Sequence, residues 1–189
     1  MAIDRVHRVA GILSRHGART RVARVTAGAG AGEIHLYASF PTMEAGTEAA
    51  VGMAHDSAYL KLMAEREANP AGDVHGPDVA RLVMGEPVPT DRVRMQRTYE
   101  MNRSGLKPAL ELLGELADMM KGHPVNLAAA VPVLSADMNS MSVIYGFPDL
   151  VTFGKMVDTV GTSPEFQEIL VRASEVGTLK TGRVLAAID

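Results

Sequence analysis

The chain has 189 residues, of which 47% are hydrophobic and 22% are charged, and its formal net charge is −3. This balance is typical of a folded globular protein, and it lacks the concentrated Lys and Arg that nucleic-acid or anionic-membrane binding requires. The absence of cysteine excludes disulfides, thiol nucleophiles and thiolate metal sites.

The first predicted element is a helix near residues 3–16, whose apolar residues recur at helical spacing. This segment lacks the apolar run of a signal peptide, and no stretch approaches the roughly 20 apolar residues that span a bilayer. We therefore expect a cytoplasmic protein with neither a membrane nor a nucleic acid as partner.

Two strands are predicted next, near 19–26 and 33–40, around a loop that contains Gly28, Gly30 and Gly32. A phosphate-binding glycine loop is followed by a helix N-terminus, whereas here a strand with period-2 alternation follows. The loop is therefore predicted to be the tip of a hairpin.

Helices are predicted from Thr42 and after Ser57, with Asp56 and Ser57 as a plausible N-cap, and a strand near 78–84 closes this part. A proline-rich connector follows at residues 85–90. We place the domain boundary there, with a first unit at 1–87 and a second at 88–189.

The second unit repeats the first at an offset of 107 residues. Phe40-Pro41 recurs as Phe147-Pro148, and the alternating residues of the strand near 33–40 fall on apolar residues. The apolar residues of the helix near 3–16 also fall on apolar residues. A single offset therefore preserves both the 3.6-residue period of a helix and the 2-residue period of a strand. Ser163-Pro164 repeats the helix start, with proline at the first helical position.

The second unit has one more element, a strand near 93–101 ahead of its helix. Its order is then βαββαβ, a ferredoxin-like α+β arrangement with helices on one face of an antiparallel sheet. The first unit lacks this first strand. Its sheet should be one strand short, or should borrow a strand from the other unit or another chain, so a homo-oligomer through a sheet edge is possible.

The stretch Arg97-Thr98-Tyr99, which runs into a turn at Gly105, resembles the opening of the NIPSNAP family. The segments 145–150 and 163–167 resemble the strand and helix pattern of the same family. The resemblance implies the dimeric α+β barrel superfamily, in which two ferredoxin-like sheets pack face to face. A tandem duplication would build that barrel within one chain.

His35 and Tyr37 are candidate catalytic residues. They lie on the strand face opposite Ile34, Leu36 and Ala38, so they would point away from the helices. Such a pair could orient a substrate or move a proton, or it could be an exposed or internally satisfied polar pair.

Arg97 and Tyr99 are the other two candidates. Arg97 interrupts an apolar strand face, where a guanidinium could bind a carboxylate or enolate or form an ordinary ion pair. The six histidines show no helical ligand pair, so neither a metal nor a cofactor is expected. His16 and His123 fall at equivalent helix ends, where they would complement the helix dipole.

These patterns leave open whether the protein is an enzyme. The first hypothesis is a NIPSNAP-like tandem α+β barrel that binds a small apolar or aromatic molecule between sheet and helices. The second is a cofactor-independent oxygenase or isomerase of a polyketide-like or phenolic compound. The third is a structural protein that associates with itself.

Overall fold

The computed structural model describes residues 2–188, which form two compact units with interleaved sequences. Unit 1 contains the described residues of 1–24, 33–75 and 187–189, and unit 2 contains 25–32 and 76–186. Two strands, β1 (Arg19–Gly28) and β7 (Thr178–Ala187), have residues in both units. This division differs from the boundary near residue 88 between the repeats, which stays a prediction.

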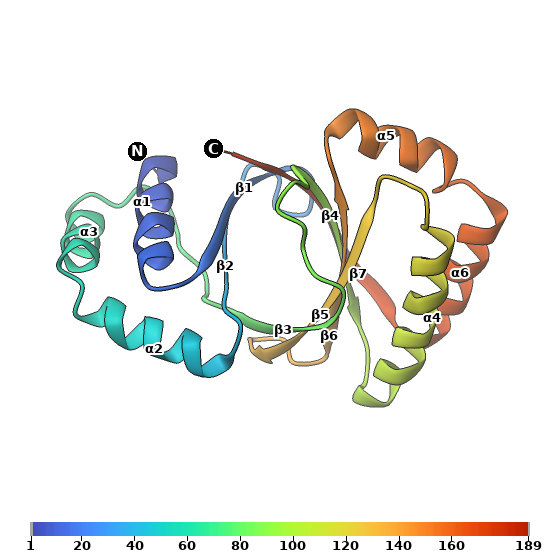
Figure 1. Cartoon of the computed structure of the whole chain (residues 1–189), viewed down its shortest axis with the longest axis horizontal. Helices are drawn as coiled ribbons and strands as arrows, with labels where there is room; N and C mark the ends of the chain where they lie inside the picture. Colours follow the sequence, from blue (N-terminus) through green and yellow to red (C-terminus); the bar gives the residue numbers. More distant parts are fainter. Residues whose placement is uncertain (1, 189) are drawn as a thin grey trace. The chain divides into compact units, whose positions relative to one another are not determined.

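Unit 1 packs three helices against a strand pair (Figure 1). The helices are α1 (Ala2–Arg15), α2 (Met43–Ala54) and α3 (Ser57–Ala68), and β2 (Ile34–Ser39) pairs antiparallel with the first half of β1. The helices bury Ile12, Met53 and Leu62 in a common core. No strand precedes α1 in the described residues.

Side-chain caps fix where the helices of unit 1 begin. The Thr42 side chain accepts a hydrogen bond from the Ala45 N–H, and Asp56 accepts from the N–H groups of Ala58 and Tyr59. Asp56 also accepts from His16 Nε2 at 3.1 Å and from Arg15 at 3.1 Å. His16 therefore joins the end of α1 to the start of α3, in addition to its expected place at a helix end.

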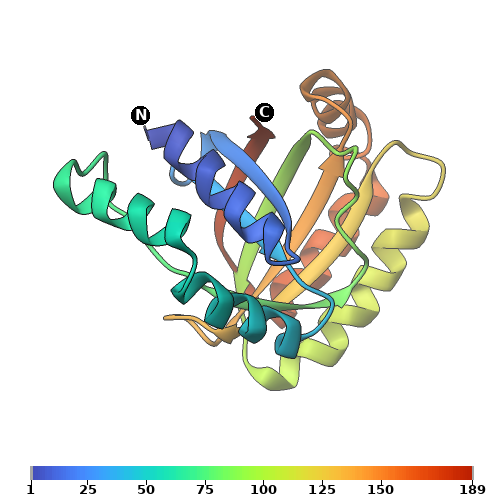
Figure 2. The same ribbon diagram turned by 60° about the vertical axis from the view of Figure 1, so that its left-hand side comes forward.

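Unit 2 contains the complete ferredoxin-like element. Its parts are β4 (Val93–Glu100), α4 (Leu106–Met119), β5 (Asn126–Leu134), β6 (Ser140–Phe147), α5 (Leu150–Thr159), α6 (Pro164–Val176) and β7, and a short 3₁₀ turn at Arg103–Gly105 precedes α4. The strands run β7-β4-β6-β5, all antiparallel. Figures 1 and 2 show α4 and α6 on one face of these strands.

The last strand of the first repeat pairs differently from the prediction. β3 (Val79–Met84) does not close a sheet in unit 1 but pairs antiparallel with β5 in unit 2. Residues 69–78 separate α3 from β3, whereas only Gly177 separates α6 from β7. The 107-residue offset therefore holds from β1 to the end of α3 and fails at the closing strand, because the longer connection lets β3 reach the free edge of β5.

The glycine loop is a hairpin tip, as predicted, and one of its glycines also permits a close backbone contact. Gly28, Gly30 and Gly32 all have positive φ, a conformation that glycine adopts without strain. A side chain at Gly28 would overlap the backbone of Gly182 in β7, and the Ala29 N–H donates to the Gly182 carbonyl at 3.0 Å. This part of the loop therefore holds the end of β1 against β7 within unit 2.

The fold is mixed α+β, with antiparallel strand pairing throughout. Strands β2 and β3 each have a single neighbouring strand. Within residues 2–188, no helix combines the length and the apolar character needed to cross a membrane.

The Asp56 cluster predicts a specific response to acid. The hydrogen bond from His16, together with those from Tyr59, Ala58 and Arg15, lowers the pKa of the Asp56 carboxyl from 3.8 to about 2. A carboxyl whose pKa is lower in the folded state stabilises the fold above its unfolded pKa, and this contribution is lost as the pH falls through the folded value. Asp56→Asn keeps an N-cap acceptor but removes the charge.

We therefore expect the fall in melting temperature between pH 4 and pH 2 to be smaller in Asp56→Asn than in the unmodified protein. His16→Gln removes the largest cause of the lowered pKa and should give an intermediate fall. Melting curves followed by circular dichroism measure this. An identical fall in all three proteins would contradict the assignment.

Candidate functional site

The helix-covered face of the unit 2 sheet is apolar and tightly packed. Alternate residues of β4 and β6 point toward α4 and α6, because side chains alternate between the two faces of a strand. Tyr145 and Phe147 of β6 are each only 3% exposed, and Met141 and Val143 of the same strand are buried beside them. This face forms the larger of the two hydrophobic cores described in residues 2–188.

A small cavity of about 40 Å³ lies within this core. Its volume would hold little more than a water molecule or two, whereas drug-sized ligands occupy pockets of about 300–1,000 Å³. The walls come from both the sheet and the two helices, and every lining residue is apolar or a tyrosine. The lining residues are Tyr99, Met101, Ala109, Leu112, Leu113, Leu116, Met141, Val143, Tyr145, Ile169, Leu170, Ala173 and Val176.

Arg97 and Tyr99 both belong to the helix-covered face. Tyr99 lines the cavity, and the Arg97 guanidinium lies 5.9 Å from the centre of the Tyr145 ring, a cation–π arrangement. Burial raises the pKa of the Tyr145 hydroxyl, nearby Tyr99 raises it further, and Arg97 opposes the shift. Tyr145 therefore stays protonated and can donate a hydrogen bond at ordinary pH.

His35 and Tyr37 lie in unit 1, on the sheet face that carries no helix of that unit. Ser14 of α1 hydrogen-bonds to Thr20 at 2.9 Å, and Thr20 is the register partner of Ala38, so α1 covers the opposite face. The Tyr37 hydroxyl lies 3.3 Å from His35 Nδ1, and His35 Nε2 lies 3.0 Å from Glu33 Oε2. The structure thus places His35 and Tyr37 within hydrogen-bond distance of each other, and the Glu33 carboxylate contacts His35 as a third member.

The four predicted candidates therefore fall into two separate groups. His35 and Tyr37 are on the helix-free face of unit 1, whereas Arg97 and Tyr99 are on the helix-covered face of unit 2. Sequence reasoning missed Glu33 and Tyr145. Both could have been found from period-2 spacing, because Glu33 precedes His35 by two residues and Tyr145 shares a face with Met141 and Val143.

The helix-free face of unit 2 is polar. Ser142 accepts a hydrogen bond from Gln96 Nε2 at 3.1 Å and shares another with Thr98 at 3.1 Å. At one end the Asp91 carboxylate is only 3% exposed and accepts from Asn126 Nδ2 at 2.9 and 3.1 Å. A side chain at Gly146 would overlap this carboxylate, so glycine makes room for it. No sequence pattern indicates this contact, because it joins three separate segments.

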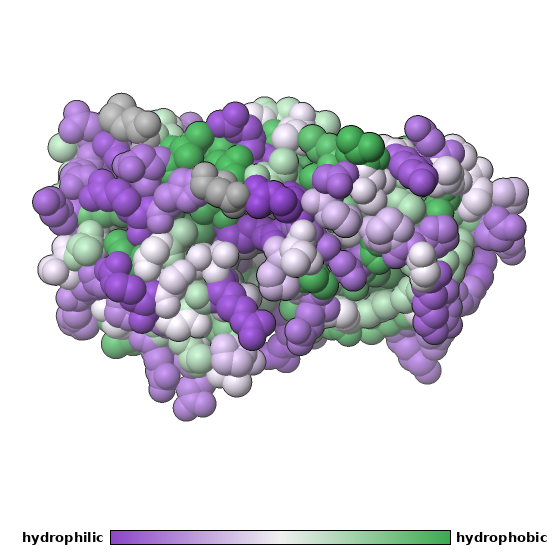
Figure 3. Space-filling model, turned by 45° about the horizontal axis from the view of Figure 1, so that its top comes forward, coloured by the Kyte–Doolittle hydropathy of each residue, from purple (hydrophilic) through white to green (hydrophobic). Residues whose placement is uncertain are grey.

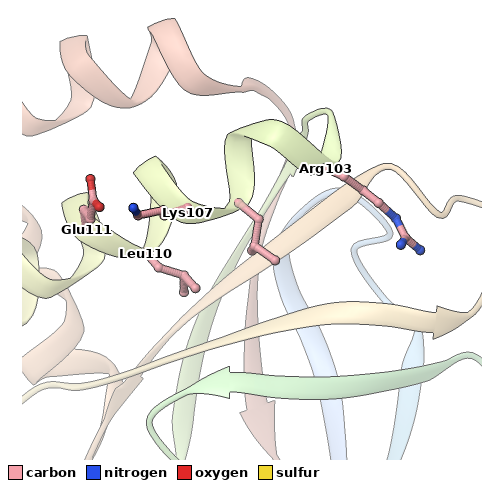
Figure 4. Close-up of a pocket in the computed structure, with 5 residues that line it drawn as sticks. Arg103, Lys107, Leu110 and Glu111 are labelled. Carbon is pink, nitrogen blue, oxygen red and sulfur yellow. The ribbon is translucent and has the colours of Figure 1, made fainter.

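A second hollow, of about 460 Å³, is open to solvent on α4 (Figure 4). Its walls are one face of the helix start, and Figure 4 shows Arg103 pointing away from Lys107 and Glu111. Because the charged groups diverge, they do not form a binding site together. On the face shown in Figure 3, apolar residues occur in separate patches among hydrophilic ones.

Residues 2–188 contain no group of three His, Cys, Asp or Glu side chains arranged to hold a metal ion. His123 follows α4, as predicted, and its N–H donates to the Met120 carbonyl. The polar groups that remain as candidates for a functional site are Tyr99 and Tyr145 beside Arg97, and the chain of Glu33, His35 and Tyr37.

No family model matches the sequence, and no curated protein matches it. Similar solved structures include two named "putative monooxygenase". The one from Lactobacillus acidophilus is 12% identical with a TM-score of 0.55, and the match covers 98% of this chain and 84% of that chain. The one from Fusobacterium nucleatum is 7% identical with a TM-score of 0.65, covering 97% and 84%.

A third similar structure is that of an anthrone oxidase-like protein, which is 8% identical with a TM-score of 0.61 over 98% of this chain and 86% of that chain. At these identities the likeness shows the fold alone. It confirms the predicted α+β fold class.

Proposed function

We propose that the protein binds a small apolar or aromatic molecule in unit 2, between the sheet and helices α4 and α6. The observation that carries this proposal is the cavity, whose lining is mostly apolar and includes two tyrosines. Binding sites for small molecules combine such walls with a few polar groups that fix orientation. Membership of the NIPSNAP family stays a prediction, as does a homo-oligomer through a sheet edge.

The cavity must enlarge to admit an aromatic ring, because about 40 Å³ is too small for one. Met101 and Met141 line it from the sheet side. Methionine is unbranched and adopts several rotamers at low cost, so these side chains can move aside. The ligand would then lie against Tyr99 and Tyr145, with the Tyr145 hydroxyl as a hydrogen-bond donor.

Filling the cavity tests this proposal. Ala173 lines it from α6, so Ala173→Leu places additional carbon atoms where the ligand would lie. We expect the affinity for 1-naphthol, measured by isothermal titration calorimetry, to fall by roughly tenfold or more, which corresponds to about 1.4 kcal/mol. Ser174→Leu is the matched control, because it adds a similar side chain at the next, exposed position of α6.

The control should bind 1-naphthol as the unmodified protein does, and circular dichroism should show that both variants are folded. Equal affinity in Ala173→Leu and Ser174→Leu would contradict a site in this cavity. The absence of binding to the unmodified protein would contradict the proposal itself.

The second candidate function is a cofactor-independent oxygenase or isomerase of a phenolic or polyketide-like compound in the same cavity. The protonated Tyr145 favours it, since a buried hydroxyl donor can stabilise the oxygen of a developing enolate. The anthrone oxidase-like neighbour suggests a probe. Deprotonated anthrone would add dioxygen at its methylene carbon, and the resulting hydroperoxide would lose water to give anthraquinone.

Oxygen consumption tests this second candidate. The unmodified protein should accelerate dioxygen uptake by anthrone above the rate in buffer, and Tyr145→Phe should reduce that acceleration by roughly tenfold or more if the hydroxyl stabilises the enolate. Binding of 1-naphthol without acceleration would support a binding protein and contradict the oxygenase.

A further inference from the structure

The helix-free face of unit 1 carries a directed hydrogen-bond chain. His35 and Tyr37 are alternate residues of β2, so their side chains lie on one face, and Glu33 directly precedes the strand. The Tyr37 hydroxyl is 3.3 Å from His35 Nδ1, and His35 Nε2 is 3.0 Å from Glu33 Oε2. The rings of His35 and Tyr37 are tilted by 31° at a centroid distance of 5.9 Å.

The carboxylate determines the direction of this chain. An ionised Glu33 can only accept, so His35 Nε2 must carry the hydrogen that it donates. In the neutral imidazole Nδ1 then has a lone pair and accepts from the Tyr37 hydroxyl. The order Tyr37 to His35 to Glu33 matches the arrangement in which a carboxylate orients a histidine that serves as a base for a hydroxyl group.

The chain is present in one repeat only. At the 107-residue offset, Glu33, His35 and Tyr37 correspond to Ser140, Ser142 and Ile144, none of which is a comparable acid or base. The alternate positions, which face the helices, are apolar in both repeats. The two copies thus share apolar residues on the face that packs against the helices, and they differ on the opposite face, where packing does not require apolar residues.

The surroundings of the chain suit an anion. Arg21 is the register partner of Tyr37 on β1, and its side chain leaves the same face of the sheet. His35 is 24% exposed and Glu33 is 57% exposed, so the chain can be reached from solvent. A positive charge on the same face of the strand pair would favour a substrate that becomes negatively charged when it loses a proton.

We propose that Glu33, His35 and Tyr37 form a proton relay that acts on a small enolisable carbonyl compound. The C–H beside the carbonyl transfers its proton to the Tyr37 oxygen while the Tyr37 proton moves to His35 Nδ1. The products are an enolate, on the sheet face that carries Arg21, and an imidazolium paired with Glu33, and Tyr37 is unchanged. The Tyr37 hydroxyl and the imidazolium exchange their hydrogens with solvent, and reversal of the transfers then delivers a solvent hydrogen to the carbon. This site is independent of the cavity in unit 2.

Hydrogen–deuterium exchange of 2-tetralone tests the relay. In D2O the unmodified protein should accelerate exchange of the protons beside the carbonyl, as followed by ¹H NMR. Tyr37→Phe and His35→Gln should each reduce the acceleration by roughly a hundredfold, the lower range for general acid–base catalysis. Glu33→Gln should reduce it less, because an amide oxygen can still accept from Nε2.

His55→Gln is the matched control, since it makes the same change at an exposed histidine of unit 1 and should leave the exchange rate unaltered. The absence of acceleration by the unmodified protein, or full acceleration in His35→Gln, would overturn the proposal. So would equal losses in His35→Gln and His55→Gln.

A second measurement does not depend on turnover. ¹⁵N NMR of the ring nitrogens, recorded at a pH where the imidazole is unprotonated, should show the His35 hydrogen on Nε2, and Glu33→Gln should shift the Nε2 signal. A hydrogen on Nδ1 would overturn the relay, because Nδ1 could not then accept from Tyr37.

Discussion

The structure depends on one constraint, that each strand places alternate side chains on two chemically different faces. The helices of each unit cover only one of them. On the covered face the sequence must supply apolar residues that pack, and the cavity with its two tyrosines is a small gap in that packing. On the other face the same strands are free to carry polar groups, such as His35 and Tyr37.

Much of the local structure could be predicted because it depends on local chemistry. The N-caps at Thr42, Asp56 and Ser163, and the hairpin at the glycine loop, all lie where the sequence indicates them. The strand that closes the first repeat was predicted at the right residues but with the wrong neighbour. The choice of neighbour is set by which sheet edge is free and by the reach of the preceding loop, and neither is visible in a strand pattern.

The candidate sites show the same limit. The alternation of the strand predicts His35 and Tyr37 on the helix-free face of unit 1. The hydrogen bond between His35 and Glu33 could not be predicted, because it depends on how the two side chains are oriented. For Arg97 the sequence suggested an anionic partner, whereas the structure places its guanidinium over the Tyr145 ring. The environment of the buried Asp91 could not be predicted, because its neighbours Asn126 and Gly146 are far from it in the sequence.

The two faces of the strands carry different chemistry, and apolar binding is proposed under the helices of unit 2. A crystal soaked with 4-iodophenol tests this most directly, because the anomalous signal of iodine locates the ligand without prior assumptions. The account predicts an iodine site between the sheet and helices α4 and α6, near Val143 and Ile169, with Met101 or Met141 displaced. An occupied iodine site elsewhere, with this cavity still closed, would contradict it.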